Sequence, residues 1–350
     1  MFIKRIKHIL SHIKADVLYI TSPENLRYYS GFTGGEGAIV LSSDRLVLLT
    51  DSRYTLQAGE EAKDFEIINV AEEKPLDHLA SLGIKTLAFE EGYLSAKAYI
   101  ALCEALPDCD FVGADSEILK QRSIKDEQEQ ALTRKASRLA CQAFDHVLPL
   151  LKPGVRELDI AMELEWFMKK GGASGASFPI ICASGPRSAM PHGVASEKKL
   201  AKGDFVTLDF GCFVGGYASD MTRTVVLGNP TDEQRHIYNI VLEAQMRAVE
   251  SIRAGVTGKE ADAVARDIIE KAGYGKQFGH SLGHGTGLLI HEQPNLSPRS
   301  ETVLESGMIV SVEPGIYVDG FGGVRIEDLV IVTEDGCENL VTAEKTLMVL

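Results

Sequence analysis

Residues 205–226 read FVTLDFGCFVGGYASDMTRTVV and predict two β-strands joined at a glycine-rich turn. Alternation along the first strand places Asp209 on its more polar face, opposite the apolar face that packs into a core. The chain returns through Asp220, and the midpoint between the two acids lies at Val214 and Gly215. We therefore expect Asp209 and Asp220 to face each other across a hairpin.

A second hairpin of the same design follows further along the chain. Residues 308–313 (MIVSVE) predict a strand ending at Glu313, residues 319–323 (DGFGG) predict the turn, and Glu327 lies on the return strand. The midpoint of the two glutamates is Gly320. Like charges placed directly opposite each other destabilise a sheet, here by about 4 kcal/mol at an effective dielectric of about 20. A divalent cation would offset this repulsion, because oxygen-rich sites bind Mg and Mn, and an added imidazole extends the range to Co, Fe and Zn.

The two hairpins fit an internal repeat. Residues 151–155 (LKPGV) and 253–256 (RAGV) each precede a helical, alanine- and glutamate-rich pattern that ends at glycine. Asp209 and Glu313 follow these two segments at similar distances. We therefore predict two structurally equivalent halves.

The region before the repeat has a different pattern. Residues 17–119 contain short β-branched runs, at 17–20, 38–41 and 46–50, that alternate with polar, alanine-rich stretches. This pattern is typical of an α/β domain. A charged stretch at 120–126 leads into a long amphipathic helical pattern. We place the boundary there, with an α/β domain at 1–122 and an α+β domain at 123–350.

Composition limits the classes of partner. The chain has 350 residues, 45% hydrophobic and 25% charged, which predicts a globular protein of two domains. Its net charge of −14 would repel phosphates, so we expect no nucleic-acid and no membrane partner. Six scattered cysteines without a C-x-x-C pair favour reduced thiols and a cytoplasmic location. The first ten residues are too charged for a signal peptide and predict an amphipathic helix.

Histidines gather in one glycine-rich segment, where residues 279–287 (GHSLGHGTG) are followed by 291–294 (HEQP). The first five letters match the G-x-S-x-G elbow of serine hydrolases. That fold needs an acid and then a histidine after the serine, yet the last histidine is His291, so we interpret Ser281 as a coincidental match. His291 also begins H-E-x-x-H, but Asn295 leaves this zinc motif incomplete.

Five blocks together resemble the pita-bread metallopeptidases, in particular the Xaa-Pro peptidases prolidase and aminopeptidase P. In order they are TLDFG (207–211), YASDMTRT (217–224), HSLGHGTG (280–287), SVEPG (311–315) and RIED (325–328). Near the start of the chain, SPENLRYYSGF (22–32) and TDSRY (50–54) resemble the creatinase-type N-terminal domain. That domain implies a homodimer.

The resemblance implies a centre of two divalent metal ions, for which manganese is our first expectation and cobalt or zinc the alternatives. Asp209 would bind one ion, His284 and Glu313 the other, and Asp220 and Glu327 both. Such a pair of ions lowers the pKa of a shared water and polarises the scissile carbonyl. Glu313 would also carry the proton.

Further residues match the substrate site of the family. His192 and His291 match its substrate histidines, suited to stabilising the oxyanion and the proline-side amide, and His280 and Arg325 are additional candidates. Arg325 could also pair with a ligating carboxylate. We expect cleavage of Xaa-Pro bonds in dipeptides or short peptides, as by a prolidase. Some prolidases carry an arginine a few residues beyond the H-E-x-P segment, where it holds the C-terminal carboxylate of a dipeptide, whereas here position 295 is Asn and the nearest arginine is Arg299. Aminopeptidase P is therefore an alternative, and a non-catalytic pita-bread binding protein is a more distant one.

Overall fold

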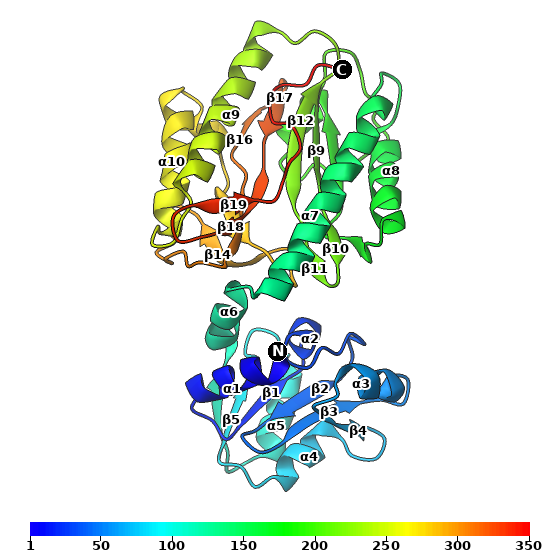
Figure 1. Ribbon diagram of the computed structural model, residues 1–350, viewed down its shortest axis with the longest axis vertical. Helices are drawn as coiled ribbons and strands as arrows, with labels where there is room; N and C mark the ends of the chain where they lie inside the picture. The colour runs from blue at the N-terminus through cyan, green and yellow to red at the C-terminus, as the bar shows by residue number, and fades with distance from the viewer. The chain divides into compact units, whose positions relative to one another are not determined.

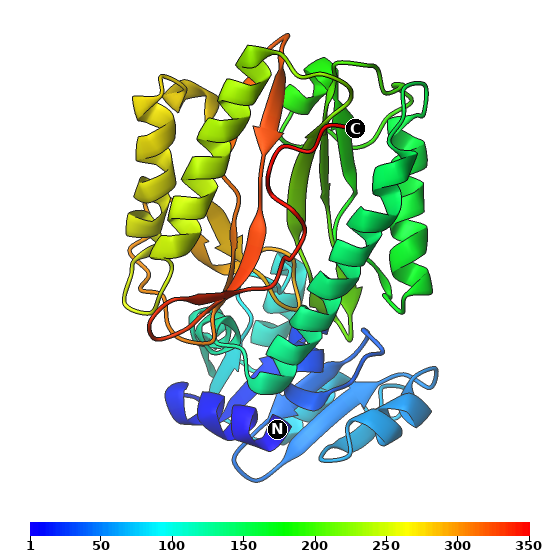
Figure 2. The same ribbon diagram turned by 45° about the horizontal axis from the view of Figure 1, so that its top comes forward.

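The computed structural model describes residues 1–350 and divides the chain into two compact units, Met1–Arg122 and Ser123–Leu350. Figures 1 and 2 show both units as ribbons. The first unit is blue to cyan and the second green to red. No helix is both long and apolar enough to cross a membrane.

The first unit is an α/β domain built on one mixed six-stranded sheet of order β4-β3-β2-β1-β5-β6. Pairs β1–β2 and β2–β3 are antiparallel, whereas β1–β5, β5–β6 and β3–β4 are parallel. Its strands are β1 (Val17–Ile20), β2 (Ala38–Leu41), β3 (Leu46–Thr50), β4 (Glu66–Asn69), β5 (Thr86–Phe89) and β6 (Asp110–Gly113). Its helices are α1 (Phe2–His12), α2 (Pro23–Ser30), α3 (Thr55–Glu61), α4 (Pro75–Ser81), α5 (Ala96–Ala105) and α6 (Asp115–Ser123), the last of which reaches the boundary. The three predicted strands and the amphipathic first helix are confirmed.

The second unit contains two helix pairs that flank its strands (Figure 1). The pairs are α7 (Glu127–Val147) with α8 (Glu157–Lys170), and α9 (Asp232–Ser251) with α10 (Gly258–Lys271). Capping boxes begin α7, α9 and α10, because Asp126, Thr231 and Thr257 each accept from the backbone three residues on. Gly154 (φ 94°) and Gly255 (φ 88°) lie in the left-handed region between the helices of each pair. The predicted repeat of helix, glycine turn and helix is therefore present in both halves.

Each half adds strands after its helices. The strands of the first half are β7 (Gly175–Ala176), β8 (Ile181–Ser184), β9 (Phe205–Phe210), β10 (Cys212–Val214), β11 (Tyr217–Ala218) and β12 (Met221–Val226). Those of the second are β13 (Gly283–Gly285), β14 (Glu292–Leu296), β15 (Ile309–Val312), β16 (Gly315–Val318), β17 (Gly322–Arg325), β18 (Asp328–Val332) and β19 (Cys337–Asn339). The main sheets have the orders β12-β9-β8 and β14-β13-β15-β18-β19. One hydrophobic core lies under α7 and α8 and a second under α9 and α10.

The first hairpin corrects one prediction. Asp209 on β9 pairs with Thr222 on β12, and the same register continues to the pair Val214 and Tyr217. The turn therefore consists of Gly215 and Gly216, with φ values of 57° and 83°. The predicted direct pairing of Asp209 with Asp220 is wrong by two residues, because a two-residue turn of this hand needs positive φ at both central positions. Asp220 instead lies two residues before Thr222, so it is diagonally opposite Asp209 on the same face of the hairpin.

The second hairpin has the predicted centre. Val312 pairs with Asp328 and Gly315 with Arg325, so the register that continues through both strand pairs sets Glu313 opposite Glu327. Gly320, at the middle of the turn, has φ 73°. Glu327 itself lies between β17 and β18 and not within a strand. The backbone of Thr222 accepts from the Glu327 N–H at 3.1 Å, which joins the two hairpins.

Candidate metal centre and active site

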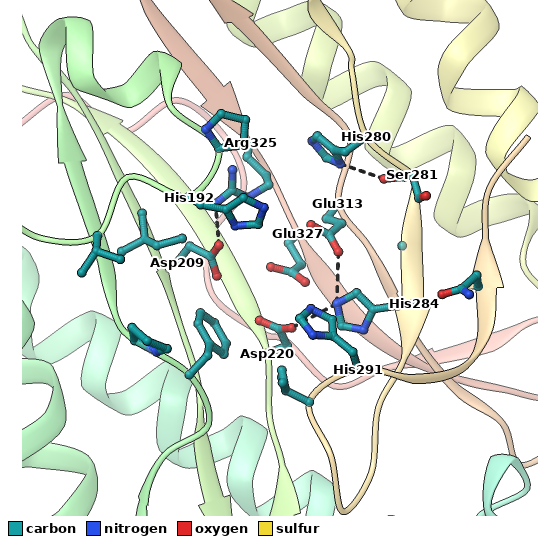
Figure 3. A pocket seen from close by; sticks show the side chains of 18 residues that line it. His192, Asp209, Asp220, His280, Ser281, His284, His291, Glu313, Arg325 and Glu327 are labelled. Atoms are coloured by element: carbon teal, nitrogen blue, oxygen red, sulfur yellow. Dashed lines mark hydrogen bonds and ion pairs between the residues drawn. The ribbon is translucent and has the colours of Figure 1, made fainter. Parts of the chain in front are cut away.

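A cavity of about 550 Å³ opens between the two halves of the second unit. This is within the usual range for a ligand site, roughly 300–1,000 Å³. All nine residues singled out from the sequence line it (Figure 3). They are His192, Asp209, Asp220, His280, His284, His291, Glu313, Arg325 and Glu327.

The four acids point toward one another at the centre of the cavity (Figure 3). One oxygen of Asp209 and one of Asp220, Oδ1 in each case, are buried without a hydrogen-bond partner. Burial, reinforced by the negative charges of neighbouring acids, raises the pKa values of Asp220 and Glu327 well above the usual range. Burial likewise raises the pKa of Glu313. The cluster is thus short of positive charge and of hydrogen-bond donors.

His284 faces the acids with a ring nitrogen that the backbone leaves available. Its Nδ1 lies 3.0 Å from the carbonyl oxygen of Gly285, which suits an Nδ1–H donor. Its Nε2 lies 3.6 Å from Asp220 and 3.4 Å from Glu313. Burial lowers the pKa of His284, which favours the neutral ring with an Nε2 lone pair directed at the carboxylates.

These residues fit a divalent metal ion. Asp220, His284 and Glu327 each offer one ligand atom, and the three atoms lie within 4.8 Å of one another. Carboxylate oxygens with a neutral imidazole are the donor set of Mn, Co and Zn sites. Asp220 of this group carries one of the two orphaned carboxylate oxygens, which a cation would meet, whereas Asp209, which carries the other, is not one of the three.

Two hydroxyl groups that the sequence reasoning missed hold the acids in place. Thr222 donates to Glu327 at 2.7 Å and accepts from Arg325 Nε at 3.2 Å. Ser311 donates to Glu313 at 2.9 Å and accepts from the backbone N–H of His284 at 3.0 Å. Thr222 and Ser311 lie on strands beside the acids, a position that the alternation of the hairpins could have indicated.

Arg325 and His280 belong to one chain of hydrogen bonds that runs from the buried Arg325 to the exposed Ser281. Arg325 forms an ion pair with Asp209 and donates to the hydroxyl of Tyr317 at 2.7 Å. That hydroxyl also lies 3.0 Å from Nε2 of His280, whose Nδ1 lies 2.8 Å from the carbonyl oxygen of Ser281. Burial raises the pKa of Tyr317 to about 12, so its hydroxyl keeps its proton at neutral pH. Both ring nitrogens of His280 are therefore engaged, and sequence reasoning did not foresee Tyr317.

His291 and His192 reach the cavity from opposite halves. The ring of His291 lies 4.4 Å from that of His284, inclined by 70°. Burial, followed by the charge of His284, lowers the pKa of His291. The next residue, Glu292, forms a buried ion pair with Lys125 at 3.2 Å and accepts from the backbone of Leu289 at 3.0 Å. This pair, not foreseen from the sequence, anchors the turn that carries His291.

One wall of the cavity is apolar. It is formed by Phe178, Pro179, Ile181, Pro191, Val194 and Ile290. A wall of this kind suits an apolar group such as a proline ring. Arg325 is the only arginine or lysine among the lining residues. Asn295 lines the cavity as a neutral side chain.

Two neighbours of the proposed site residues, Ser281 and Asp328, have other contacts. Ser281 lines the cavity, but the histidine nearest to it, His280, contacts its backbone oxygen and not its hydroxyl. Asp328 is fully buried in an ion pair with Arg223 at 2.8 Å and with Lys345 at 2.6 Å. Its pKa is lowered because these two cations outweigh the effect of burial. Asp328 is therefore a structural ion-pair residue.

Comparisons with known proteins agree with this architecture. Residues 131–334 match the model of metallopeptidase family M24, and residues 3–124 match the creatinase/prolidase N-terminal domain. An Xaa-Pro dipeptidase of Pyrococcus furiosus is 42% identical over 336 residues, 95% of each chain. The structure of an Xaa-Pro dipeptidase from Bacillus anthracis is 48% identical, with a TM-score of 0.95 over 100% of this chain and 99% of that one.

A relative named as an aminopeptidase, the alternative expected from the sequence, is similarly close. An X-Pro aminopeptidase from Thermotoga maritima has 42% identity and a TM-score of 0.92 over 100% of this chain and 99% of its own. The predicted α+β pita-bread catalytic domain, preceded by a creatinase-like α/β domain, is confirmed. The chain is a peptidase that belongs to metallopeptidase family M24, the pita-bread family of the prolidases.

Proposed function

We propose that this protein hydrolyses Xaa-Pro bonds at a centre of two divalent metal ions. The proposed ligands are Asp209, Asp220, His284, Glu313 and Glu327, with manganese as the expected metal and cobalt or zinc as alternatives. One observation carries the proposal: four carboxylates line one cavity with the half-buried imidazole of His284, and two carboxylate oxygens are buried without a hydrogen-bond partner. Ions bound there would activate water and polarise the scissile carbonyl group.

The chain's own residues would bind the peptide and move the proton. The apolar wall suits the proline ring, whose nitrogen carries no hydrogen and so needs no acceptor. His192 and His291 line the cavity, and we propose that they would donate to the carbonyl oxygen as negative charge develops on it. Glu313 has a raised pKa and is held by Ser311, which suits a group that takes a proton and passes it to the departing proline nitrogen.

The role of His280 differs from that of the other two histidines. Its ring nitrogens bond to Tyr317 and to the backbone of Ser281, so we propose that it shapes the cavity and does not transfer protons. Arg325 is similarly committed to Asp209 and Tyr317. We therefore propose that both contribute to substrate binding through the shape and charge of the wall.

Two substrate lengths are compatible with this site. Our first proposal is an Xaa-Pro dipeptidase, because the Pyrococcus furiosus relative of 42% identity carries that name. The alternative, an Xaa-Pro aminopeptidase acting on longer peptides, has a specific observation in its favour. The only lining cation, Arg325, already pairs with Asp209, and Asn295 is neutral, so the cavity lacks an unpaired partner for a dipeptide's terminal carboxylate.

Kinetics on three peptides test the proposal. Purified protein loaded with Mn should cleave Ala-Pro or Ala-Pro-Ala, with chelation abolishing the activity and Mn restoring it. Equal rates on Ala-Ala would contradict proline specificity, and faster cleavage of Ala-Pro-Ala than of Ala-Pro would favour the aminopeptidase. No hydrolysis by metal-loaded protein would favour the non-catalytic binding protein.

We also propose a homodimer in the cytoplasm, with domains at 1–122 and 123–350. The creatinase-type N-terminal domain supports the dimer, and six free thiols fit a reducing compartment. Light scattering of the full chain should give twice the chain mass of 38.1 kDa. A monomer at micromolar concentration, or recovery of the protein from an oxidising compartment with disulfides, would contradict these two proposals.

A further inference from the structure

The loop that carries His192 has little regular structure of its own. It runs from the end of β8 at Ser184 through the 3₁₀ turn Gly185–Ala189 to about Ser196. Pro191, His192 and Val194 of this loop line the cavity. The His192 ring makes no hydrogen bond within the chain, so its place depends on how the backbone of the loop is held.

A single buried carboxylate ties both ends of this loop together. Glu157, the first residue of α8, is 0% exposed. Its Oε1 accepts from the backbone and the hydroxyl of Ser184, at 2.8 Å each. Its Oε2 accepts from the backbone of Ser196 at 3.2 Å and from its hydroxyl at 2.6 Å. Glu157 thus bridges the point where the loop leaves β8 and the point where it ends.

Arg187 extends this link into the loop itself. Its Nε donates to Oε2 of Glu157 at 3.1 Å, which supplies a positive partner for the buried charge. Its Nη2 donates to the carbonyl oxygen of Val194 at 2.6 Å, two residues beyond His192. The Glu157–Arg187 pair therefore spans the loop on both sides of the histidine.

The other half contains a comparable arrangement. Asp262 on α10 is buried, accepts from the backbone of Leu282 at 3.0 Å and pairs with Arg266 at 2.6 Å. Arg266 in turn donates to the carbonyl oxygens of His280 at 2.8 Å and of Phe278 at 3.0 Å. In both halves, a buried helix acid and an arginine hold the backbone that carries a cavity histidine.

We propose that Glu157 and Arg187 are positioning residues that hold His192 at the substrate, acting through the backbone of its loop. The inference rests on the proposed Xaa-Pro hydrolysis and adds residues that lie outside the cavity. Loss of the Arg187 link would let the loop move. A displacement of about 1 Å can cost about 10²-fold in rate.

A double-mutant cycle distinguishes this role from a general structural one. Arg187→Gln should lower kcat/KM for the better of Ala-Pro and Ala-Pro-Ala by about 10- to 100-fold. In a His192→Ala background the same change should cost less than about 2-fold, because the residue through which it acts is gone. The matched control is Arg156→Gln. Arg156 precedes Glu157 at the start of α8, and its loss breaks exposed ion pairs with Asp159 and Glu197, so kcat/KM should stay unchanged.

A readout independent of activity completes the test. In imidazole NMR spectra, the signal of His192, assigned by its absence from His192→Ala, should shift or sharpen in Arg187→Gln while other histidine signals stay. Bound metal and the melting temperature should stay near the wild-type values. Additive losses in the cycle, an unmoved His192 signal, or a general loss of metal would overturn the inference. A wild type that cleaves neither peptide would refute the proposed function, and the NMR comparison would still decide this inference.

Discussion

Asp220→Asn should change stability in opposite directions with and without metal. In the wild type, Asp220 and Glu327 offer atoms within 4.8 Å of each other. Two charges at that distance repel by about 3.5 kcal/mol at an effective dielectric of about 20. The raised pKa values of the two acids reduce this repulsion, because one of them can keep a proton. Removing the charge should therefore stabilise the metal-free protein.

Bound metal should reverse this difference in stability, so that the wild type becomes more stable than Asp220→Asn. A ligand at about 100 times its dissociation constant stabilises the folded state by about 2.7 kcal/mol. For a domain of this size, that corresponds to a rise of about 5–10 °C in melting temperature. Asp220→Asn loses a proposed shared ligand, so we expect less than half of this rise, little bound Mn, and no peptidase activity.

Differential scanning calorimetry measures the melting temperature of both proteins with chelator and with Mn, and metal analysis measures the bound Mn. Together they check the predicted stability change of Asp220→Asn with and without metal. The exposed turn residue Asp319 provides a matched control, since Asp319→Asn should behave as the wild type in both conditions. The reasoning fails if Mn raises the melting temperature of Asp220→Asn as much as that of the wild type. It also fails if the metal-free variant is less stable than the metal-free wild type.

Three further predictions concern single residues. His291→Ala should lower turnover by about 10²–10³-fold with normal metal content, as for loss of one oxyanion donor; loss of metal, by elemental analysis, would make His291 a ligand instead. Ser281→Ala should retain activity within about 2-fold in the same peptide assay, and inactivation with normal folding would revive the serine-hydrolase interpretation. Asp328→Asn leaves Arg223 buried with a weakened partner and should lower the free energy of unfolding in urea by about 3–5 kcal/mol; a change under about 1 kcal/mol would contradict this.

The sequence predicted the second hairpin better than the first, for a local reason. The midpoint of Glu313 and Glu327 coincides with Gly320, and the observed register has this centre. In the first hairpin both Gly215 and Gly216 have positive φ, which moves the centre of the turn past the midpoint of the two acids. Counting residues between acids cannot reveal such a shift, because the turn type sets the register.

The residues that support the site, such as Tyr317 and Glu157, could not be predicted from the sequence, and here the reason is distance along the chain. The nine predicted cavity residues lie in short motifs, so local patterns and the family resemblance bring them to attention. Tyr317 meets His280 from 37 positions away, and Glu157 meets Ser196 from 39. Such contacts depend on how strands and helices pack in three dimensions. From the sequence alone, a glutamate such as Glu157 at the start of a helix is explained by its favourable interaction with the helix dipole. Only the fold shows that it also binds Ser184 and Ser196.

The charge of the cluster is itself an argument for more than one cation. Four carboxylates and the single guanidinium of Arg325 leave a formal charge of −3 around one cavity. Without metal, the chain can reduce this charge only by keeping protons, which is the physical content of the raised pKa values of Asp220, Glu313 and Glu327. One divalent ion would leave −1, which still repels an anionic nucleophile, whereas two would leave +1. The proposed centre with two ions would therefore let all four acids ionise and would turn a site that repels anions into one that attracts them.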